Sequence, residues 1–295
     1  LEGVEHCLDA LAGVVAEAEI DCDLTLPGCW ELVHRDAPDT RPLWRDGETW
    51  LCVEDTVAGG TIDPGALVAG LARAAIRAGA TLHEQAAVHG IEPGQPLRLR
   101  VGAGSLTADR AFVALNAYTG TLLAIPVRLT PALTLAVSTD VLEPGAIAAL
   151  GLSGGSPFYT LDMPYLWGRM TRDGRLVLGA GLVMNDERDV AALRLHGPNG
   201  AASLARLEAR IARFHPVLAG AAVRERWGGP IAFTPDRTPI LSRLPRAPDV
   251  IVSAGCAGHG IALGVRVGQL VADAFAGGED LPRWGALPSA PATRS

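Results

Sequence analysis

The sequence contains 295 residues, of which 48% are hydrophobic and 19% are charged, a composition typical of a globular protein with a sizeable core. The formal net charge of −7 and the lack of any basic run argue against a nucleic-acid partner. No lysine occurs, which excludes Schiff-base chemistry and a Walker-type phosphate lysine. The five cysteines lack CxxC spacing, so we expect no metal site and no disulfide framework, with a reducing cytoplasm as the location.

The first elements are two helices separated by short strands. Apolar residues at helical spacing over residues 4–15 predict an amphipathic helix. Strand-like segments follow, including Cys29–His34 and Thr49–Val53. An acidic N-cap followed by proline, Asp63-Pro64, predicts the start of a second helix, and Gly79 predicts its end.

A strand and a hairpin come next. Ala80–Ile91 has the pattern of a strand, and Leu97–Val101 and Ser105–Asp109 are predicted to pair across a glycine-containing turn. A buried strand, Ala111–Leu115, completes this part of the chain. This strand lies in a longer apolar stretch, residues 111–127. Polar residues and a proline interrupt the stretch, so no membrane span is expected. Helix, strand, hairpin and strand together indicate an α/β unit with a small antiparallel insertion.

Antiparallel strands dominate the sequence after Pro126. Val127–Leu142 alternates between apolar and polar residues, and Tyr165–Met170 with Leu176–Ala180 flanks a hairpin turn. Apolar residues at helical spacing over 204–214 predict a helix, and Val223–Phe233 predicts one more strand. This pattern predicts an α+β module that is inserted between two pieces of the α/β module.

The most informative segment is a strand, a glycine-rich turn and a helix near the C-terminus. Val250–Ala254 is the strand, and Gly255, Gly258 and Gly260 lie in the turn. Glycines let a ligand approach the backbone, and the first amides of the helix can donate hydrogen bonds to it. The spacing is GxxGxG rather than GxGxxG, and only a polar tail follows, so a flavin ring fits better than a pyrophosphate. The alternative is a turn whose glycines serve only packing.

With these segments in place, the chain resembles the FAD-dependent amine and amino-acid oxidoreductases of the D-amino-acid-oxidase superfamily. It is most similar to the bacterial sarcosine, glycine and gamma-glutamylputrescine oxidases. Four stretches carry the resemblance in matching order: TIDPGALVAGLARAAIRAGATLHEQAAVHGIE (61–92), FVALNAYTG (112–120), RWGGPIAFTPDRTPILSRL (226–244) and VIVSAGCAGHGIALG (250–264). The likeness covers most of residues 1–280.

The resemblance implies an α/β FAD-binding domain interleaved with an α+β substrate domain built on an antiparallel sheet. The expected FAD-binding domain comprises 1–20, 61–125 and 236–280, and the expected substrate domain comprises 21–60 and 126–235, with 281–295 as a loose tail. The family begins with a strand, GxGxxG and a helix, and no GxGxxG occurs in this sequence. We therefore expect this chain to be a fragment of a longer protein, or else a natural truncation that binds flavin poorly.

Carried over residue by residue, the resemblance places the cofactor beside three stretches of the chain. The expected contacts are Val88, through its backbone; Ala114, Leu115 and Asn116; and Gly255, Ala257, Gly258, His259, Gly260 and Ile261. Val88 has the alternative of a plain core residue, and Asn116 that of a helix cap. Family members that bind flavin covalently use a cysteine near the third stretch. None occurs in Trp227–Asp236, so we expect noncovalent FAD, and Cys256 as a small buried thiol.

The expected substrate is a small amine or amino acid, and its expected contacts are Tyr165, Trp167, Arg169 and Trp227. Alternation along a strand puts the first three on one face. Aromatic rings can surround an amine, and an arginine can hold a carboxylate. The expected reaction is oxidation of a C–N bond by hydride transfer to flavin N5, for which no protein acid or base is assigned. The rival hypothesis is a non-catalytic subunit that keeps the fold but not the cofactor.

Overall fold

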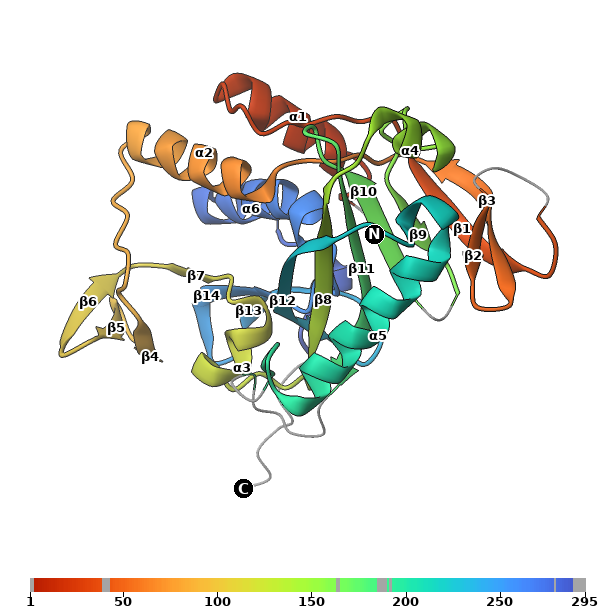
Figure 1. Cartoon of the computed structure of the whole chain (residues 1–295). Helices are drawn as coiled ribbons and strands as arrows, with labels where there is room; N and C mark the ends of the chain where they lie inside the picture. Colours follow the sequence, from red (N-terminus) through yellow and green to blue (C-terminus); the bar gives the residue numbers. More distant parts are fainter. Residues whose placement is uncertain are drawn as a thin grey trace. The chain divides into compact units, whose positions relative to one another are not determined.

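The computed structural model describes residues 3–38, 43–162, 165–184, 190, 193–278 and 280–288 (Figure 1). The chain forms two compact units, each made of discontinuous segments. Unit 1 contains residues 1–20, 64–131 and 231–295, and unit 2 contains 21–63 and 132–230. The breaks at 20, 63, 131 and 230 lie near the expected domain ends at 20, 60, 125 and 235.

Unit 1 combines helices with two small sheets. One sheet has the order β13-β14-β7, and the other is the antiparallel sheet β4-β5-β6. Strands β7 and β14 are parallel, with Val250 opposite Ala111. The elements are α1 (Cys7–Glu17), α2 (Pro64–Arg77), β4 (Val88–Glu92), β5 (Leu97–Val101), β6 (Gly104–Ala108), β7 (Ala111–Val113), η1 (Asn116–Tyr118), α3 (Thr119–Leu122), β13 (Ile240–Leu244), β14 (Ala247–Ala254), α6 (Gly260–Ala276) and η4 (Arg283–Gly285).

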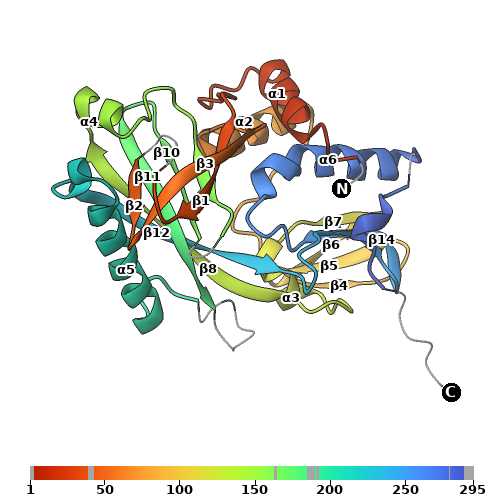
Figure 2. The same ribbon diagram turned by 90° about the vertical axis from the view of Figure 1, so that its right-hand side faces the viewer.

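Strand β14 is the centre of unit 1. Val250, Ile251 and Val252 are fully buried, because one face of the sheet packs on the cluster around Leu97 and the other packs on α6. A continuous apolar run is the expected pattern for a strand covered on both faces. Figure 2 shows α6 lying over this sheet, with α1 beside it. The strand therefore fixes the position of the turn that follows it.

Two expectations in unit 1 are corrected. The strand expected over Ala80–Ile91 forms only from Val88, and residues 80–87 are exposed, with no partner strand in the described part of the chain. A strand needs a neighbour to satisfy its backbone groups. The tail is not loose over 281–288, because Trp284 packs against the α6 cluster and Leu287 is buried. Residues 289–295 lie outside the described part.

Unit 2 is built on an eight-stranded, mostly antiparallel sheet with the order β12-β8-β11-β10-β9-β1-β3-β2. Strands β1 and β9 form a parallel pair within it. The elements are β1 (Cys29–Arg35), β2 (Trp44–Asp46), β3 (Thr49–Val57), β8 (Thr130–Val141), α4 (Pro144–Ala149), β9 (Phe158–Thr160), β10 (Leu166–Met170), β11 (Arg175–Met184), α5 (Pro198–Phe214), η3 (Pro216–Leu218) and β12 (Val223–Phe233). Strands β8 and β12 begin or end in unit 1.

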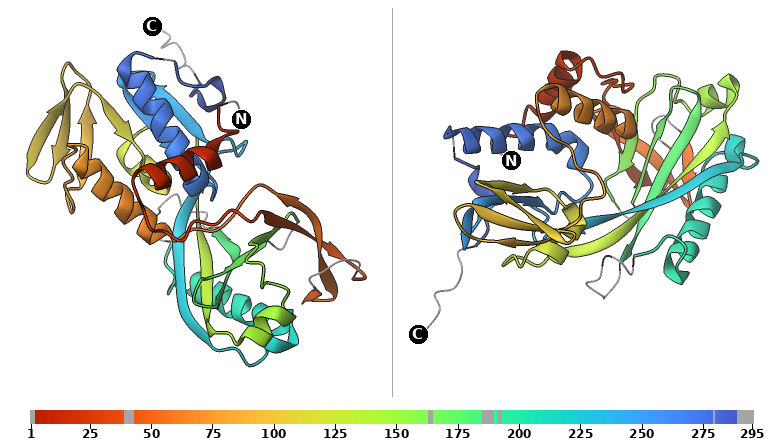
Figure 3. Two further views of the ribbon diagram at one scale, coloured as in Figure 1. Left: turned by 90° about the horizontal axis from the view of Figure 1, so that it is seen from above. Right: turned by 90° about the vertical axis from the view of Figure 1, so that its left-hand side faces the viewer.

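Helix α5 covers one face of this sheet (Figures 1 and 3). Its apolar side, with Leu207 and Ile211, packs on a core that contains the aromatic group Trp44, Phe158 and Phe214. The Trp44 indole donates a 3.0 Å hydrogen bond to the Leu150 carbonyl, which satisfies its buried N–H. Because side chains alternate along a strand, residues next to these core positions point to the opposite face.

The structure confirms the predicted fold class, an α/β domain interleaved with an α+β domain on an antiparallel sheet. Within the residues that it describes, no helix combines the length and the apolar character needed to span a membrane.

Candidate functional site

In unit 1, a cavity of about 150 Å³ lies where the parallel strands β7 and β14 end and α6 begins. Ligands of open parallel sheets bind at this edge, beyond the carboxyl ends of the strands. Phe112 and Ala114 come from the β7 side and Ser253 from β14, whereas Gly260 and Gly264 come from α6. The lining is mostly apolar, with Asn116 and Ser253 among its polar side chains.

The backbone at this edge takes an unusual conformation. Gly255, Ala257 and Gly258 have φ values of +70°, +50° and +95°, and Asn116 at the end of β7 has +46°. A Cβ on Gly255 would lie 2.8 Å from the Thr234 methyl carbon, so this position also lacks space. Non-glycine residues with positive φ are strained and often occur at functional sites. Two such residues, Asn116 and Ala257, follow the ends of the adjacent strands β7 and β14.

Most of the expected cofactor contacts lie at this edge, and one does not. Residues 114–116 are exposed after β7, and residues 258–261 are exposed at the start of α6. Gly255 is buried and Ala257 is half-buried in the turn. Val88 is half-buried in β4, opposite Val101, in the separate antiparallel sheet. Asn116 does not cap the short helix, because it is itself the first helical residue and Leu115 precedes it as the N-cap.

Cys256 also lines this cavity, and its side chain is a neutral thiol. Burial raises its pKa above the ordinary value, although a hydrogen bond with Ser253 opposes the effect. A thiol is a poor nucleophile compared with its thiolate. The side chain therefore serves packing at this position.

In unit 2, the expected substrate contacts share one face of the sheet, opposite α5. Trp167 and Arg169 alternate with the core residues Leu166 and Gly168 in β10. Tyr165 immediately precedes the strand and is partly exposed. Burial raises the pKa of the Tyr165 hydroxyl, so the group stays protonated at neutral pH.

Trp227 belongs to the same face by alternation along β12. A Cβ on its neighbour Gly228 would lie 3.3 Å from the side chains of Leu133 and Leu135, which belong to the core under α5. Trp227 therefore points to the opposite face and is 41% exposed.

A cross-strand row on this face includes two residues that the sequence did not single out. Glu31 of β1 is opposite Tyr159 of β9, and Tyr159 is opposite Trp167 of β10. The Trp167 indole covers Gly179 of β11, where a Cβ would lie 2.1 Å from the ring. The pairing of β1 with the three-residue strand β9, more than 120 residues later, left no local signal in the sequence. The alternation of side chains within the predicted strand Cys29–His34 was the one sequence feature that could have placed Glu31 on this face.

Arg169 lines an open cavity of about 530 Å³ at the end of β10. Asp23 and Asp63 share this cavity, and Arg172 forms a 2.7 Å ion pair with Asp23. The Arg169 guanidinium itself makes no hydrogen bond or ion pair with another described residue. A planar guanidinium in such a position can donate two parallel hydrogen bonds to a carboxylate.

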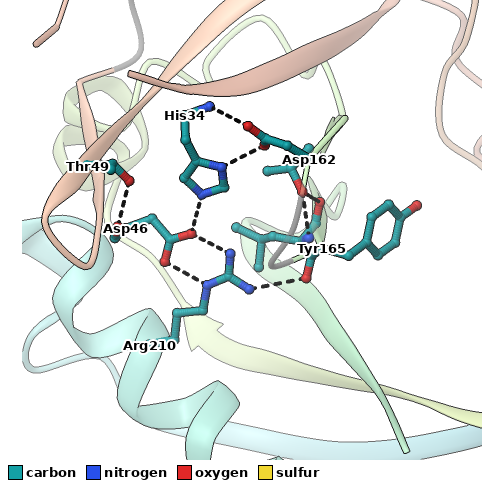
Figure 4. Close-up of polar contacts among 8 residues, drawn as sticks. His34, Asp46, Thr49, Asp162, Tyr165 and Arg210 are labelled. Carbon is teal, nitrogen blue, oxygen red and sulfur yellow. Dashed lines mark hydrogen bonds and ion pairs between the residues drawn. The ribbon is translucent and has the colours of Figure 1, made fainter. Parts of the chain in front are cut away.

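The core side of unit 2 contains a buried charged cluster (Figure 4). Asp46 accepts hydrogen bonds from Arg210 Nε at 2.8 Å and from His34 Nε2 at 2.8 Å. His34 Nδ1 and Asp162 Oδ1 are 2.6 Å apart, and Arg210 also donates to the Tyr165 carbonyl at 3.1 Å. Burial by itself would raise the pKa of Asp46, but its hydrogen bonds with Arg210 and His34 outweigh this and lower it. The cluster joins α5, β1 and β2 to the segment that carries Tyr165.

Known proteins share both the sequence pattern and the fold of this chain. The family described as FAD dependent oxidoreductase matches residues 2–274. A probable oxidoreductase OrdL of Rhizobium meliloti (strain 1021) is 30% identical over 218 residues, which are 72% of this chain and 47% of that protein. Gamma-glutamylputrescine oxidoreductase of Escherichia coli (strain K12) is 28% identical over 79% of this chain and 52% of its own. The chain thus spans about half the length of these curated relatives.

A solved structure of glycine oxidase from Geobacillus kaustophilus matches with a TM-score of 0.72 and 21% identity, over 95% of this chain and 81% of that one. The amino acid oxidase NikD matches with a TM-score of 0.73 and 14% identity, over 99% of this chain and 84% of its own. These likenesses show a common fold. Together with the family match over nearly the whole sequence, they establish that the chain belongs to the FAD-dependent oxidoreductase family.

Proposed function

We propose that this chain is the greater part of an FAD-dependent oxidoreductase that oxidises a C–N bond of an amine or amino acid. The observation that carries the proposal is the strained, glycine-rich turn at the carboxyl ends of β7 and β14, in a chain that belongs to this family. The names of several relatives support the substrate class. Gamma-glutamylputrescine, glycine and iminodiacetate, which occur in those names, are all amines or amino acids.

The residues at this edge fit part of a flavin. A Cβ on Gly258 or Gly264 would meet no atom within 4 Å, so a flat ring has room to approach the turn. The first amides of α6 would donate hydrogen bonds to the ring, and the positive end of the helix would favour electron-rich atoms there. When bound, FAD would supply at N5 the acceptor for a hydride from the substrate. We expect the FAD to be noncovalent, since burial keeps Cys256 a neutral thiol.

The face of the unit 2 sheet opposite α5 would bind the substrate. Tyr165, Trp167 and Trp227 would surround the amine and exclude water from it, and Arg169 would hold a carboxylate where the substrate has one. Together, these side chains would orient the reacting carbon and shield it from solvent. A neutral amine needs no protein base to lose a hydride, so the proposal assigns none.

The test compares this chain with a form extended at its N-terminus by a strand–GxGxxG–helix segment. We expect the extended form to bind FAD stoichiometrically and to release it on acid precipitation, because the bond is noncovalent. The chain alone should retain little flavin, because it lacks a pyrophosphate cradle. Visible spectra before and after precipitation give both results.

Two outcomes would contradict the proposal. Flavin that remains with the acid precipitate would show a covalent bond. An extended form that is folded but colourless after incubation with FAD would favour a non-catalytic subunit that keeps only the fold.

A further inference from the structure

Tyr165, one of the proposed substrate contacts, lies just outside the strand that follows it. Strand β10 begins at Leu166, which is opposite Ala180 of β11. A residue outside the ladder is not held in place by hydrogen bonds between strands. Other contacts must therefore fix the backbone of Tyr165 and the direction of its ring.

The peptide group that joins Tyr165 to Leu166 is held at both of its ends. Its carbonyl oxygen accepts a 3.1 Å hydrogen bond from Arg210 Nη1, and its N–H donates a 2.9 Å hydrogen bond to Thr160 Oγ1. Because a peptide group is planar, two contacts at opposite ends fix its orientation. That orientation sets the direction of the bonds at the Tyr165 Cα. Figure 4 shows the carbonyl facing Arg210 and the ring pointing away from it.

Arg210 is itself held before it reaches this carbonyl. Its Nε and Nη2 donate to the two carboxylate oxygens of Asp46, and both side chains are largely buried. A guanidinium is planar, so two fixed nitrogens leave the third in a fixed direction. The Nη1 atom is therefore oriented by Asp46 to donate to Tyr165.

The same cluster holds Asp162, which precedes Tyr165 by three residues. The Asp162 carboxylate accepts a 3.2 Å hydrogen bond from the backbone N–H of His34 and lies 2.6 Å from His34 Nδ1. The other ring nitrogen of His34 lies 2.8 Å from Asp46. Asp46 is thus the shared partner of the two groups that hold Asp162 and Tyr165.

Attachment of α5 alone does not require this cluster. The helix already packs on the core through Leu207 and Ile211. Buried charges lose their hydration, so apolar side chains of similar volume often stabilise a fold as well as an ion pair does. Apolar side chains could not, however, donate a hydrogen bond to the Tyr165 carbonyl. That bond is what the charged pair supplies in addition to packing.

We propose that Arg210 is a positioning residue for Tyr165. Supported by Asp46, it holds the Tyr165 carbonyl and thereby directs the ring to the face opposite α5. It acts through the backbone of Tyr165 and contacts no substrate itself. That the Tyr165 ring contacts the substrate rests on the proposed function, whereas the dependence of the ring on Arg210 does not.

The experiment uses the flavin-free chain labelled with 3-fluorotyrosine and ¹⁹F NMR at pH 7. The sequence contains three tyrosines, and Tyr165→Phe assigns the signal of Tyr165. Arg210→Lys keeps a positive charge beside Asp46 but lacks the planar fork that reaches both Asp46 and the carbonyl.

Arg226→Lys is the matched control. Arg226 joins β12 to the same helix through two hydrogen bonds to the Glu208 carboxylate, at 2.6 and 3.0 Å. Its one further bond within the described part of the chain is to the Val223 carbonyl. The control therefore removes an arginine fork between α5 and the sheet without touching the segment that carries Tyr165.

We expect Arg210→Lys to move the Tyr165 signal toward its position in the urea-unfolded chain, and Arg226→Lys to leave it in place. Urea unfolding followed by circular dichroism gives the stability of each variant, so a local shift is separated from a general loss of structure. A second variant combines Asp46→Asn with Arg210→Met. It removes both charges together and leaves no unpaired charge of this pair in the core, so it should fold and should also move the Tyr165 signal.

An unmoved Tyr165 signal in folded Arg210→Lys or in the folded double variant would overturn the inference. So would an equal movement in Arg226→Lys, or a Tyr165 signal that is already at its unfolded position in the unmodified chain. If Arg210→Lys does not fold, the double variant decides the matter. Because no flavin is present, a negative result here leaves the flavin proposal standing, and a colourless extended form would leave the role of Arg210 standing.

Discussion

Two glycines of the same turn have different physical reasons to be glycine. Gly258 has a φ of +95°, a conformation that a side chain disfavours by about 1–2 kcal/mol. Gly260 has no such requirement, and a Cβ there would meet its nearest atom, Cys256 Cβ, at an ordinary 3.9 Å. Replacement of Gly258 therefore changes both the backbone and the space above the turn. Replacement of Gly260 changes only the space.

This difference makes Gly260→Val the sharper probe of flavin approach. In the N-terminally extended protein, we expect Gly260→Val and Gly258→Val to abolish flavin binding, because each side chain would occupy the space that the ring needs. Gly260→Val should change the free energy of unfolding by less than about 0.5 kcal/mol, and Gly258→Val should lower it by about 1–2 kcal/mol. Flavin absorbance per protein and urea unfolding measure the two effects.

Gly268→Val is the control, because Gly268 lies two turns further along α6 and also has open space around it. It should retain flavin. If all three variants bind flavin equally, the glycines of the turn serve only packing.

At the level of elements, the buried cluster of Asp46, His34 and Arg210 attaches α5 to the edge of the sheet. The Asp46 side chain is 6% exposed, so its removal would leave the largely buried Arg210 guanidinium and His34 imidazole without their shared partner. We expect Asp46→Asn to lower the free energy of unfolding by about 3 kcal/mol at pH 7. Urea denaturation followed by circular dichroism measures the change.

The same variant should also lose part of the acid sensitivity of the protein. A carboxylate whose pKa is lowered in the folded state stabilises the fold above its unfolded pKa, about 3.9, and loses this effect as the pH falls through its folded pKa. The difference between wild type and Asp46→Asn should therefore shrink between pH 5 and pH 3. Asp162→Asn is the control, because Asp162 touches the same histidine but is 45% exposed. If Asp162→Asn lowered stability as much as Asp46→Asn does, the burial of Asp46 could not be the cause of the larger loss.

Elements with a strong local pattern could be predicted from the sequence, and those defined by their neighbours could not. β12 has the predicted bounds, Val223–Phe233, and β14 contains the predicted apolar run Val250–Ala254. The three-residue strands β2 and β9 have too few residues to show a period, so the row at Glu31 and the cluster at Asp46 were both missed. The ion pair between Asp46 and Arg210 spans 164 residues, a pairing that only the folded sheet defines.

For the whole molecule, unit 1 has features of a domain that lacks a neighbouring layer. Leu82 is 55% exposed and Phe112 is 38% exposed, and the segment 80–87 is exposed and has no partner strand among the described residues. β7 is an edge strand of its sheet. Exposed apolar residues beside an open strand edge are unusual in a complete domain. The curated relatives, of which this chain spans about half, are long enough to supply such a layer.

We therefore expect an N-terminal strand–GxGxxG–helix extension to pair with β7 and to order residues 80–87. Hydrogen exchange followed by mass spectrometry tests this directly, since amides gain protection when they enter a ladder. Peptides that cover 80–87 and 108–115 should exchange at least about 10-fold more slowly in the extended protein than in the chain alone. A peptide from α5 in unit 2, Leu204–Phe214, should exchange at the same rate in both, because its core is complete without the extension. Equal exchange at 80–87 and 108–115 in the two proteins would mean that the extension folds elsewhere, and the open edge of β7 would then require a different partner.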